Sequence, residues 1–369
     1  VIAITGSCGK TTLKEMIVSI LEKKFPRQVL STKGNLNNEY GVPLTLMRLS
    51  KQHKAAVIEL GANHLHEIAY LAEIAKPDIA VVTNAGNAHI EGFGSLDRVA
   101  EGKGEIYSSL SETGYAVINN DDVYAPYWKN LSHNRTQQLT TFAIKNNADV
   151  VANTGNVEQP GWMVKTPKGE FILNLPIPGK HNVLNALAAI ATCQLIDVSN
   201  EQIKKALEKF VNISGRLEIN TRQKHFILIN DSYNANPESV RAAIDVLAAY
   251  HDSNNQDRIN KNKTILILGD MGELGNEGKQ LHQQVGQYAA QKKISALYTV
   301  GELSCNSTDE FNKYNKKESK IPPHYDNITS LIEQIKTIDL TGAIVLIKGS
   351  RKMAMEGVVE ALEKYNRCY

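Results

Sequence analysis

The sequence predicts an α/β fold in two domains, each built on a mainly parallel sheet covered by helices. Three observations lead to this prediction: short apolar strands alternate with helical segments, the alternation restarts near residues 214–216, and a glycine-rich loop joins the first strand to the first helix. Buried strands separated by helices are typical of parallel sheets, because a parallel connection needs a crossover segment. We therefore expect domains at residues 1–213 and 214–369, both of ordinary size.

The elements of the first domain follow from their hydrophobic patterns. Strands are expected at 1–5, 28–32, 55–58, 79–83 and 115–119, where short apolar runs contain many β-branched residues. Helices are expected at 13–21, at 44–49, up to about residue 75, and at 100–110, 183–195 and 200–210. Residues 139–178 alternate, contain many turn residues and lack a helical period, so a small antiparallel subsheet is expected there.

The second domain repeats the alternation. Strands are expected at 226–230, 264–268, 296–300 and 343–347, and helices at 237–250, 278–292, 327–336 and 352–365. The asparagine-rich stretch 252–263 and the lysine-rich stretch 313–320 are interpreted as exposed loops.

The composition excludes several classes of protein. Lysine and arginine total 41 against 39 acidic residues, and this near balance of charge indicates neither nucleic-acid binding nor an acidic tail. The four cysteines, Cys8, Cys193, Cys305 and Cys368, form no paired motif, which indicates a reducing, cytoplasmic setting and argues against structural zinc. No apolar run approaches the ~20 residues of a membrane span. Because Val1 already lies inside a predicted strand, we infer that a segment N-terminal to it is missing.

The loop after the first strand has the features of a phosphate-binding loop. It reads Gly6-Ser7-Cys8-Gly9-Lys10-Thr11-Thr12, between a strand and a helix. Glycines let backbone N–H groups approach phosphate oxygens, the helix N-terminus favours an anion, and a lysine and a hydroxyl serve the phosphates and Mg²⁺. The spacing Gly-x-x-Gly-Lys-Thr is two residues shorter than the usual loop, so this is a variant. It predicts binding of a nucleoside triphosphate.

Two polar residues follow neighbouring predicted strands. Glu59 comes directly after strand 55–58, and His89 lies just beyond strand 79–83. Ligands of open α/β sheets bind at the carboxyl edge, so both residues should lie near the phosphate loop. A carboxylate and an imidazole there could hold Mg²⁺ directly or through water. Alternatively, Glu59 is a solvated acid at a strand end and His89 an ordinary loop histidine.

The chain resembles the ATP-dependent Mur ligases of peptidoglycan synthesis. The resemblance extends over the whole chain and rests on several motifs in order: residues 5–12, Glu59-Leu60-Gly61, Asn87-Ala88-His89, residues 179–188, Gly215-Arg216 and residues 230–237. The stretches 231–237, 269–275 and 348–351 favour the branch that adds D-alanyl-D-alanine, and the Asp-Asn-Pro-Arg signature of the diaminopimelate-adding branch is absent.

The resemblance implies a central phosphate-loop domain followed by a Rossmann-like domain. It also implies a cytoplasmic ligase, expected to be monomeric, that uses ATP and two Mg²⁺ ions. Its partners would be a UDP-N-acetylmuramoyl tripeptide and D-alanyl-D-alanine, with no nucleic acid and no membrane. Members of the family carry an N-terminal UDP-binding domain, which we expect to be missing here. The tripeptide carboxylate would be phosphorylated, and the dipeptide amine would attack the acyl phosphate.

Site roles also follow from the resemblance. Lys10 would meet the phosphates, while Thr11 and Glu59 would hold the Mg²⁺ of ATP. His89 would serve the second metal, together with Lys103, which falls where the family has a carbamylated lysine. From the residues alone, Lys103 is one more surface lysine.

The remaining expected contacts extend into the second domain. Asn185 would meet adenine, Asp231 the ribose and Arg216 the γ-phosphate, so the site should be complete only when the domains close. Arg351, at the start of the last helix, is a candidate for a substrate carboxylate, although a surface arginine is an equally good interpretation.

Three other functions are compatible with the sequence. A folate-polyglutamating ligase would share the loop and the acyl-phosphate chemistry, and would accept glutamate. A non-catalytic nucleotide-binding module of the same family would release no ADP. A plain phosphate-loop ATPase would hydrolyse ATP without an acceptor.

Overall fold

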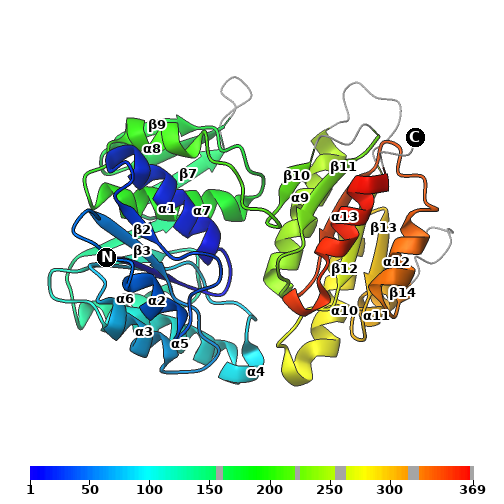
Figure 1. The fold of residues 1–369 in the computed structure, drawn as a ribbon, viewed down its shortest axis with the longest axis horizontal. Helices are drawn as coiled ribbons and strands as arrows, with labels where there is room; N and C mark the ends of the chain where they lie inside the picture. The colour runs from blue at the N-terminus through cyan, green and yellow to red at the C-terminus, as the bar shows by residue number, and fades with distance from the viewer. Residues whose placement is uncertain (155–160, 221–224, 254–262, 315–323, 366–369) are drawn as a thin grey trace. The chain divides into compact units, whose positions relative to one another are not determined.

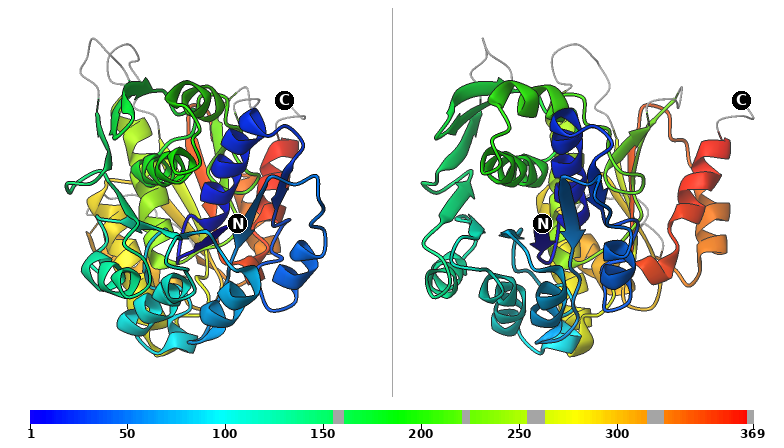
Figure 2. Two further views of the ribbon diagram at one scale, coloured as in Figure 1. Left: turned by 90° about the vertical axis from the view of Figure 1, so that its left-hand side faces the viewer. Right: turned by 60° about the vertical axis from the view of Figure 1, so that its left-hand side comes forward.

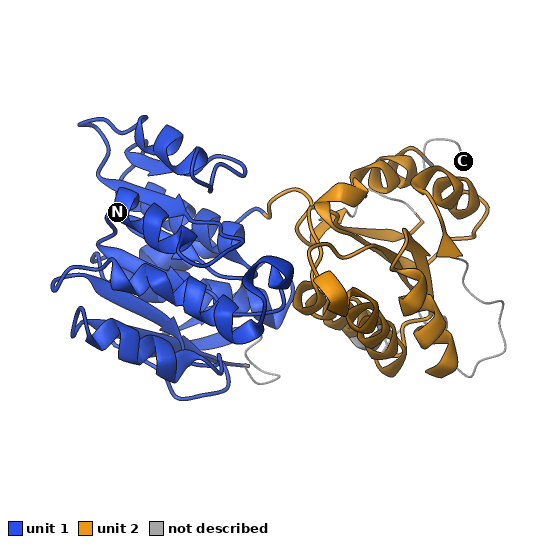
Figure 3. Cartoon of the chain, turned by 90° about the horizontal axis from the view of Figure 1, so that it is seen from below, with its two compact units in different colours: residues 1–211 blue, residues 212–369 orange. Residues whose placement is uncertain are grey.

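The computed structural model describes residues 1–154, 161–220, 225–253, 263–314 and 324–365. It divides into two compact units, unit 1 at Val1–Val211 and unit 2 at Asn212–Tyr369 (Figure 3). The predicted loops at 252–263 and 313–320 lie largely outside the described residues. No helix in the described part of the chain is long and apolar enough to cross a membrane.

The described residues of unit 1 form one nine-stranded sheet in the order β2-β3-β1-β4-β5-β6-β7-β8-β9 (Figure 1). The strands are β1 (Ile2–Thr5), β2 (Val29–Ser31), β3 (Ala55–Glu59), β4 (Ile79–Val82), β5 (Tyr115–Asn119), β6 (Leu139–Ala143), β7 (Val150–Thr154), β8 (Trp162–Thr166) and β9 (Gly169–Leu173). The strand β1 lies between β3 and β4 and is parallel to both. The chain leaves β1 toward β2 on one side and returns to β4 on the other, so the carboxyl end of β1 is a switch point.

Helices cover both faces of this sheet. They are α1 (Lys10–Lys24), α2 (Gly41–Leu46), α3 (Glu67–Ala75), α4 (Ile90–Phe93), α5 (Leu96–Ser108), α6 (Ala125–His133), α7 (Lys180–Gln194) and α8 (Asn200–Leu207). Alternation along β1 sends Ile2 and Ile4 into the core under α1, α7 and α8, and Ala3 into the core under α3, α5 and α6. The helix α1 packs against α7 and α8 (Figures 1 and 2).

Residues 139–173 differ in detail from the predicted small antiparallel subsheet. The strands β6 and β7 join the central sheet in parallel, β8 pairs antiparallel with β7, and β9 pairs antiparallel with β8. All four extend the main sheet. The predicted fold class, a mainly parallel sheet with added antiparallel strands and a second α/β sheet, is confirmed.

Unit 2 has a six-stranded sheet in the order β10-β11-β15-β12-β13-β14 among its described residues. The strands are β10 (Glu218–Asn220), β11 (Ile227–Asp231), β12 (Thr264–Gly269), β13 (Ala296–Val300), β14 (His324–Tyr325) and β15 (Ile344–Lys348), with only β10 antiparallel. The helices are α9 (Pro237–Ser253), α10 (Gly278–Gln291), α11 (Cys305–Tyr314), α12 (Ile328–Ile335) and α13 (Glu356–Tyr365), with short 3₁₀ turns η1 (Gly275–Glu277) and η2 (Arg351–Met353). Alternating residues of β11, β12 and β15 fill one core under α9 and α10 and another under α12 and α13.

Candidate active site

The phosphate loop lies between β1 and α1 and needs its glycines. Gly6 and Gly9 both have positive φ angles, 139° and 85°. A Cβ atom on Gly6 would lie 1.9 Å from Thr83 Oγ1, and one on Gly9 would lie 2.6 Å from Asn185 Oδ1. Only glycine combines this backbone with these close approaches. The second distance also places the side chain of Asn185, in α7, directly against the loop.

Residues 83–86, which follow β4, hold the loop in shape. The hydroxyl of Thr83 donates to the carbonyl of Cys8 (2.6 Å), and the backbone N–H of Cys8 donates to Asn84 Oδ1 (2.9 Å). The hydroxyl of Ser7 donates to the carbonyl of Gly86 (3.1 Å) and accepts from its N–H (2.9 Å). Sequence reasoning assigned no role to Thr83 or Asn84, although their place directly after a strand is the signal that pointed to Glu59.

Lys10 begins α1 and bends back over the loop. Its Nζ donates to the carbonyl of Gly6 at 2.6 Å, so the ammonium lies beside the backbone that would face phosphate oxygens. Thr11 and Thr12 occupy the first turn of the same helix; Thr11 is partly exposed and Thr12 is buried.

Glu59, the last residue of β3, is buried, and only one of its two carboxylate oxygens has a hydrogen-bond partner among the described residues. Its side chain is 2% exposed, and Oε1 accepts from Asn37 Nδ2 at 2.8 Å. Oε2 is buried and has no hydrogen-bond partner within the described part of the chain. A buried carboxylate oxygen without a donor is costly unless a cation meets it, and carboxylate oxygen is a preferred ligand of Mg²⁺. Glu59 therefore fits a Mg²⁺ ligand. The described residues hold no group of three or more His, Cys, Asp and Glu that could bind a metal alone.

Lys103 lies in α5 and is completely buried. Its Nζ donates to the carbonyl of Ala62 at 3.0 Å, three residues beyond Glu59, and lies 4.9 Å from the centre of the Phe93 ring. Burial holds the pKa of Lys103 well below its usual value, and the positive charge of Lys10 lowers it further. The interpretation of Lys103 as a surface lysine is wrong, because α5 turns this face toward the sheet.

His89 is the N-cap residue of the short helix α4. Its φ angle is 60°, an uncommon left-handed conformation for a non-glycine residue. The bonds between the loop and residues 84–86 place the segment that leads to His89 beside the phosphate loop. Unit 1 thus gathers the loop residues, Glu59, Lys103 and Asn185 at one edge of its sheet, with His89 on the segment that joins this edge to α4.

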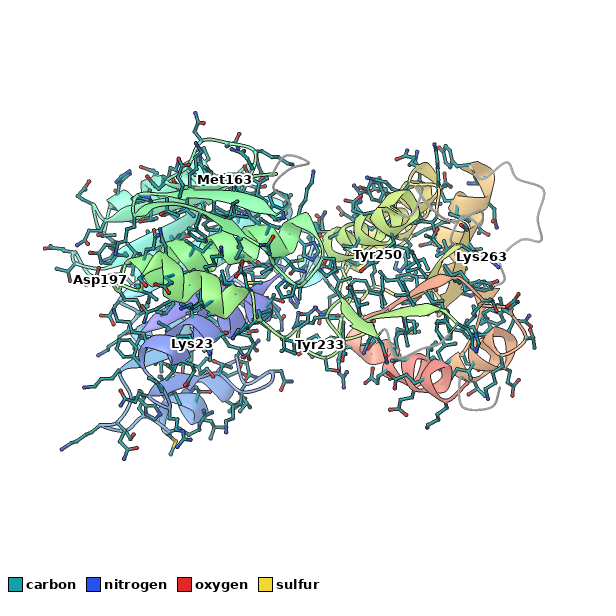
Figure 4. All side chains as sticks on the ribbon, turned by 90° about the horizontal axis from the view of Figure 1, so that it is seen from above. Lys23, Met163, Asp197, Tyr233, Tyr250 and Lys263 are labelled. Carbon is teal, nitrogen blue, oxygen red and sulfur yellow. The ribbon has the colours of Figure 1, made fainter. Side chains whose placement is uncertain are left out.

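Arg216, Asp231 and Arg351 lie in unit 2. The guanidinium of Arg216 is 4.3 Å from the centre of the Tyr233 ring, and that of Arg351 is 5.9 Å from the same ring. Tyr233 is labelled in Figure 4. Arg351 is exposed and pairs with Glu356 at 2.9 Å. Both guanidinium groups thus lie close to one aromatic ring, within the range of a cation–π contact.

Asp231, at the end of β11, has both carboxylate oxygens engaged. Oδ2 pairs with Lys348 Nζ at 2.6 Å, and Oδ1 accepts from the N–H of Leu217 at 3.1 Å. Burial raises the pKa of Asp231, and the charge of Lys348 acts against this rise. Sequence reasoning did not assign this buried ion pair, which joins the ends of β11 and β15. The bond to Asp231 Oδ1 also holds Leu217, the residue that follows Arg216.

A mainly parallel sheet with this loop at its switch point defines a nucleotide-binding α/β protein. Residues 4–193 match the family described as Mur ligase middle domain, and residues 215–351 match the family described as Mur ligase, glutamate ligase domain. The chain belongs to the Mur ligase family. The resemblance predicted from the motifs is confirmed.

Individual relatives share one name. The UDP-N-acetylmuramoyl-tripeptide–D-alanyl-D-alanine ligase of Escherichia coli (strain K12) is 38% identical over 373 residues, which cover 100% of this chain and 78% of that protein. The same enzyme of Bacillus subtilis (strain 168) is 33% identical, with 98% and 75% covered. Among solved structures, MurF from Acinetobacter baumannii has a TM-score of 0.85 at 35% identity, over 98% of this chain and 76% of that one. MurF ligase from Thermotoga maritima in complex with ADP has a TM-score of 0.81 at 26% identity, over 99% and 80%.

Proposed function

We propose that this chain is an ATP-dependent ligase that joins D-alanyl-D-alanine to a UDP-N-acetylmuramoyl tripeptide during the synthesis of peptidoglycan precursors. The observation that carries the proposal is that three features lie at one sheet edge: the phosphate loop, the Glu59 carboxylate with one hydrogen-bonded oxygen, and the buried amine of Lys103. The substrates come from the names of relatives that match 98–100% of the chain. ADP in the Thermotoga structure supports ATP as the nucleotide.

The reaction proceeds in two steps. A carboxylate oxygen of the tripeptide attacks the γ-phosphorus of ATP, and the bond to the bridging oxygen breaks to release ADP. The neutral amine of the dipeptide then attacks the acyl phosphate. The resulting tetrahedral intermediate expels phosphate, and the nitrogen loses a proton to leave an amide. Phosphorylation is needed because a free carboxylate has no adequate leaving group.

Residues of unit 1 would orient the phosphates. Lys10 neutralises charge that builds up on them, and the loop and the α1 N-terminus bind them through N–H groups. Asn185 lies against Gly9 and would meet the adenine.

Thr11, Glu59, His89 and carbamylated Lys103 would hold two Mg²⁺ ions, which bring two anions together and stabilise the developing charge. The lowered pKa of Lys103 supports its role as a carbamylated ligand, because only the uncharged amine adds CO₂ to become a carbamate anion.

Three residues of unit 2 have proposed roles. Arg216 would meet the γ-phosphate, Arg351 a substrate carboxylate and Asp231 the ribose. Asp231 also holds the N–H of Leu217, the residue that follows Arg216. We place the reaction in the cytoplasm, where the thiols of Cys193 and Cys305 stay reduced.

A phosphate-release assay with purified protein tests the proposal. Release should require Mg-ATP, the UDP-linked tripeptide and D-alanyl-D-alanine together, with one ADP formed per amide bond. Glutamate in place of the dipeptide should give no product. Phosphate release without an acceptor would indicate an ATPase, acceptance of glutamate with a folate substrate would indicate the other ligase, and no release under any condition would indicate a binding module.

A further inference from the structure

The two oxygens of the Glu59 carboxylate have different surroundings. Oε1 accepts from Asn37 Nδ2 at 2.8 Å, and Oε2 is buried without a partner among the described residues. A carboxyl group rotates easily about its last side-chain torsion, because that torsion has a broad energy profile. A single hydrogen bond to one oxygen therefore decides which way the other oxygen points.

Asn37 is itself held in place. Its carbonyl accepts from the N–H of Gly61 at 2.8 Å, and its own N–H donates to the carbonyl of Asn35 at 2.8 Å. A Cβ atom on Gly61 would lie 2.9 Å from Asn37 Oδ1, so the glycine lets the amide come close to the end of β3. These bonds hold the loop before α2 against the segment that follows β3, next to Glu59.

We propose that Asn37 is a positioning residue that directs Oε2 of Glu59 toward Mg²⁺; this inference rests on the metal role of Glu59 in the proposed function. An asparagine suits this task, because its amide donates a hydrogen bond without adding a charge that would compete with the cation. Removing it leaves both carboxylate oxygens buried without a donor and free to rotate. Outer partners of metal ligands typically contribute about 10–100-fold in metal affinity or activity.

The neighbouring residue offers a matched control. Asn38 Oδ1 accepts from the N–H of Gly41 at 2.9 Å and so serves the start of α2, not Glu59. Asn37→Ala and Asn38→Ala remove the same atoms from adjacent positions of one loop. Asn37→Leu keeps the branched shape of the side chain and replaces its polar atoms with methyl groups, so it covers the case in which the alanine variant does not fold.

The test is a MgCl₂ titration of two readouts on the full chain. ATP affinity is measured by calorimetry with Mg²⁺ and with EDTA, and phosphate release is measured across the same Mg²⁺ range. For Asn37→Ala and Asn37→Leu we expect the half-saturating Mg²⁺ concentration to rise about 10–100-fold. ATP affinity in EDTA should be unchanged, and the rate should recover at high Mg²⁺. Asn38→Ala should follow the wild type.

Two outcomes would overturn the inference. One is a wild-type Mg²⁺ requirement in both Asn37 variants, and the other is an equal shift in Asn38→Ala, which would show a general effect of the loop. Glu59→Gln separates this failure from that of the proposed function. If Glu59→Gln shifts the Mg²⁺ requirement and the Asn37 variants do not, only the positioning role is wrong. If Glu59→Gln has no effect, the metal role of Glu59 is wrong as well.

Discussion

Lys103 and Lys14 are two fully buried lysines of unit 1 with different surroundings. Lys14 Nζ donates to the carbonyl of Thr32 at 2.7 Å and pairs with Glu15. Lys103 donates to the carbonyl of Ala62, and burial and the charge of Lys10 hold its pKa well below the usual value. An amine that loses its proton easily reacts with CO₂, so the lowered pKa of Lys103 suits this lysine to carbamylation.

We expect Lys103→Ala to lower the rate of ligation on the order of 100-fold, because Mg²⁺ loses an anionic ligand. Formate or acetate should restore part of the rate by occupying the position of the lost carbamate. The measurement is phosphate release with and without formate. Lys14→Ala, also at a buried lysine, is the control and should gain nothing from formate. Full activity of Lys103→Ala would remove this residue from the site.

Gly9→Ala tests the phosphate loop. The left-handed backbone at φ 85° costs an alanine about 1–2 kcal/mol, and the added Cβ displaces the Asn185 amide. We expect ATP affinity to fall at least about tenfold, with an unchanged circular dichroism spectrum. Gly34→Ala has a similar backbone strain, with φ 55° and nothing within 4 Å of the new Cβ, and should bind ATP normally. Equal affinities of both variants would argue that the loop around Gly9 does not contact the nucleotide.

At this scale, the sequence predicted residues that stand at fixed places relative to strands. Glu59 and the phosphate loop were found because each directly follows a buried strand, and such ends meet at one sheet edge. Asn37 was not found, because its bond to Glu59 joins positions 22 residues apart through a loop whose path only tertiary structure defines. The burial of Lys103 was missed for a different reason: lysine is rarely buried, and its pattern on α5 resembles an exposed face.

Among the elements, α10 is fixed to the loop after β12 by a buried histidine. His282 Nε2 accepts from the N–H of Met271 at 3.0 Å, so Nδ1 carries the proton and donates to the carbonyl of Gly278 at 2.7 Å. Burial lowers the pKa of His282 below 6.5, and therefore the folded protein keeps this histidine neutral.

This arrangement predicts a loss of stability in acid. Well above pH 6.5 the histidine is neutral in both states, and below that value the unfolded chain takes up a proton more readily than the folded protein does, because the pKa of His282 is lowered in the folded state. The free energy of unfolding should therefore fall by up to about 1.4 kcal/mol at one pH unit below the ordinary histidine pKa of 6.5. Urea unfolding at pH 7.5 and at pH 5.5 measures this loss of stability. His282→Gln should reduce this difference, whereas His133→Gln, at an exposed histidine, should not. An unchanged difference in His282→Gln would show that other groups govern it.

The elements themselves were predicted unevenly. The strands β1, β3, β4 and β5 are short apolar runs between helices, and the structure has them where the sequence indicated. The direction of β6 and β7 was not predictable, because alternation reports which faces are buried and is the same for parallel and antiparallel pairing. The helix α11 was not predicted, since its sequence is mostly polar and only Phe311 is a large apolar residue at its buried face.

At the scale of the whole chain, each unit has its own hydrophobic cores. Every residue of the two cores of unit 1 precedes residue 211, and every residue of the two cores of unit 2 follows residue 216. A unit that buries its apolar side chains within itself can fold alone. The phosphate loop, Glu59, Lys103 and Asn185 belong to unit 1, and Arg216, Asp231 and Arg351 belong to unit 2.

The division predicts the behaviour of a fragment of residues 1–211. We expect it to fold, with a cooperative thermal transition, and to bind Mg-ATP about 10–100-fold more weakly than the full chain, because it lacks charge-assisted contacts worth about 1.5–3 kcal/mol. It should release no phosphate with the two substrates, since the groups of unit 2 are absent. Calorimetry with ATP and circular dichroism melting measure both properties, and the same fragment with Lys10→Ala is the control for specific binding. An unfolded fragment would show that unit 1 depends on unit 2 for its stability. A fragment that binds ATP as tightly as the full chain would show that Arg216 and Asp231 do not contribute to nucleotide binding.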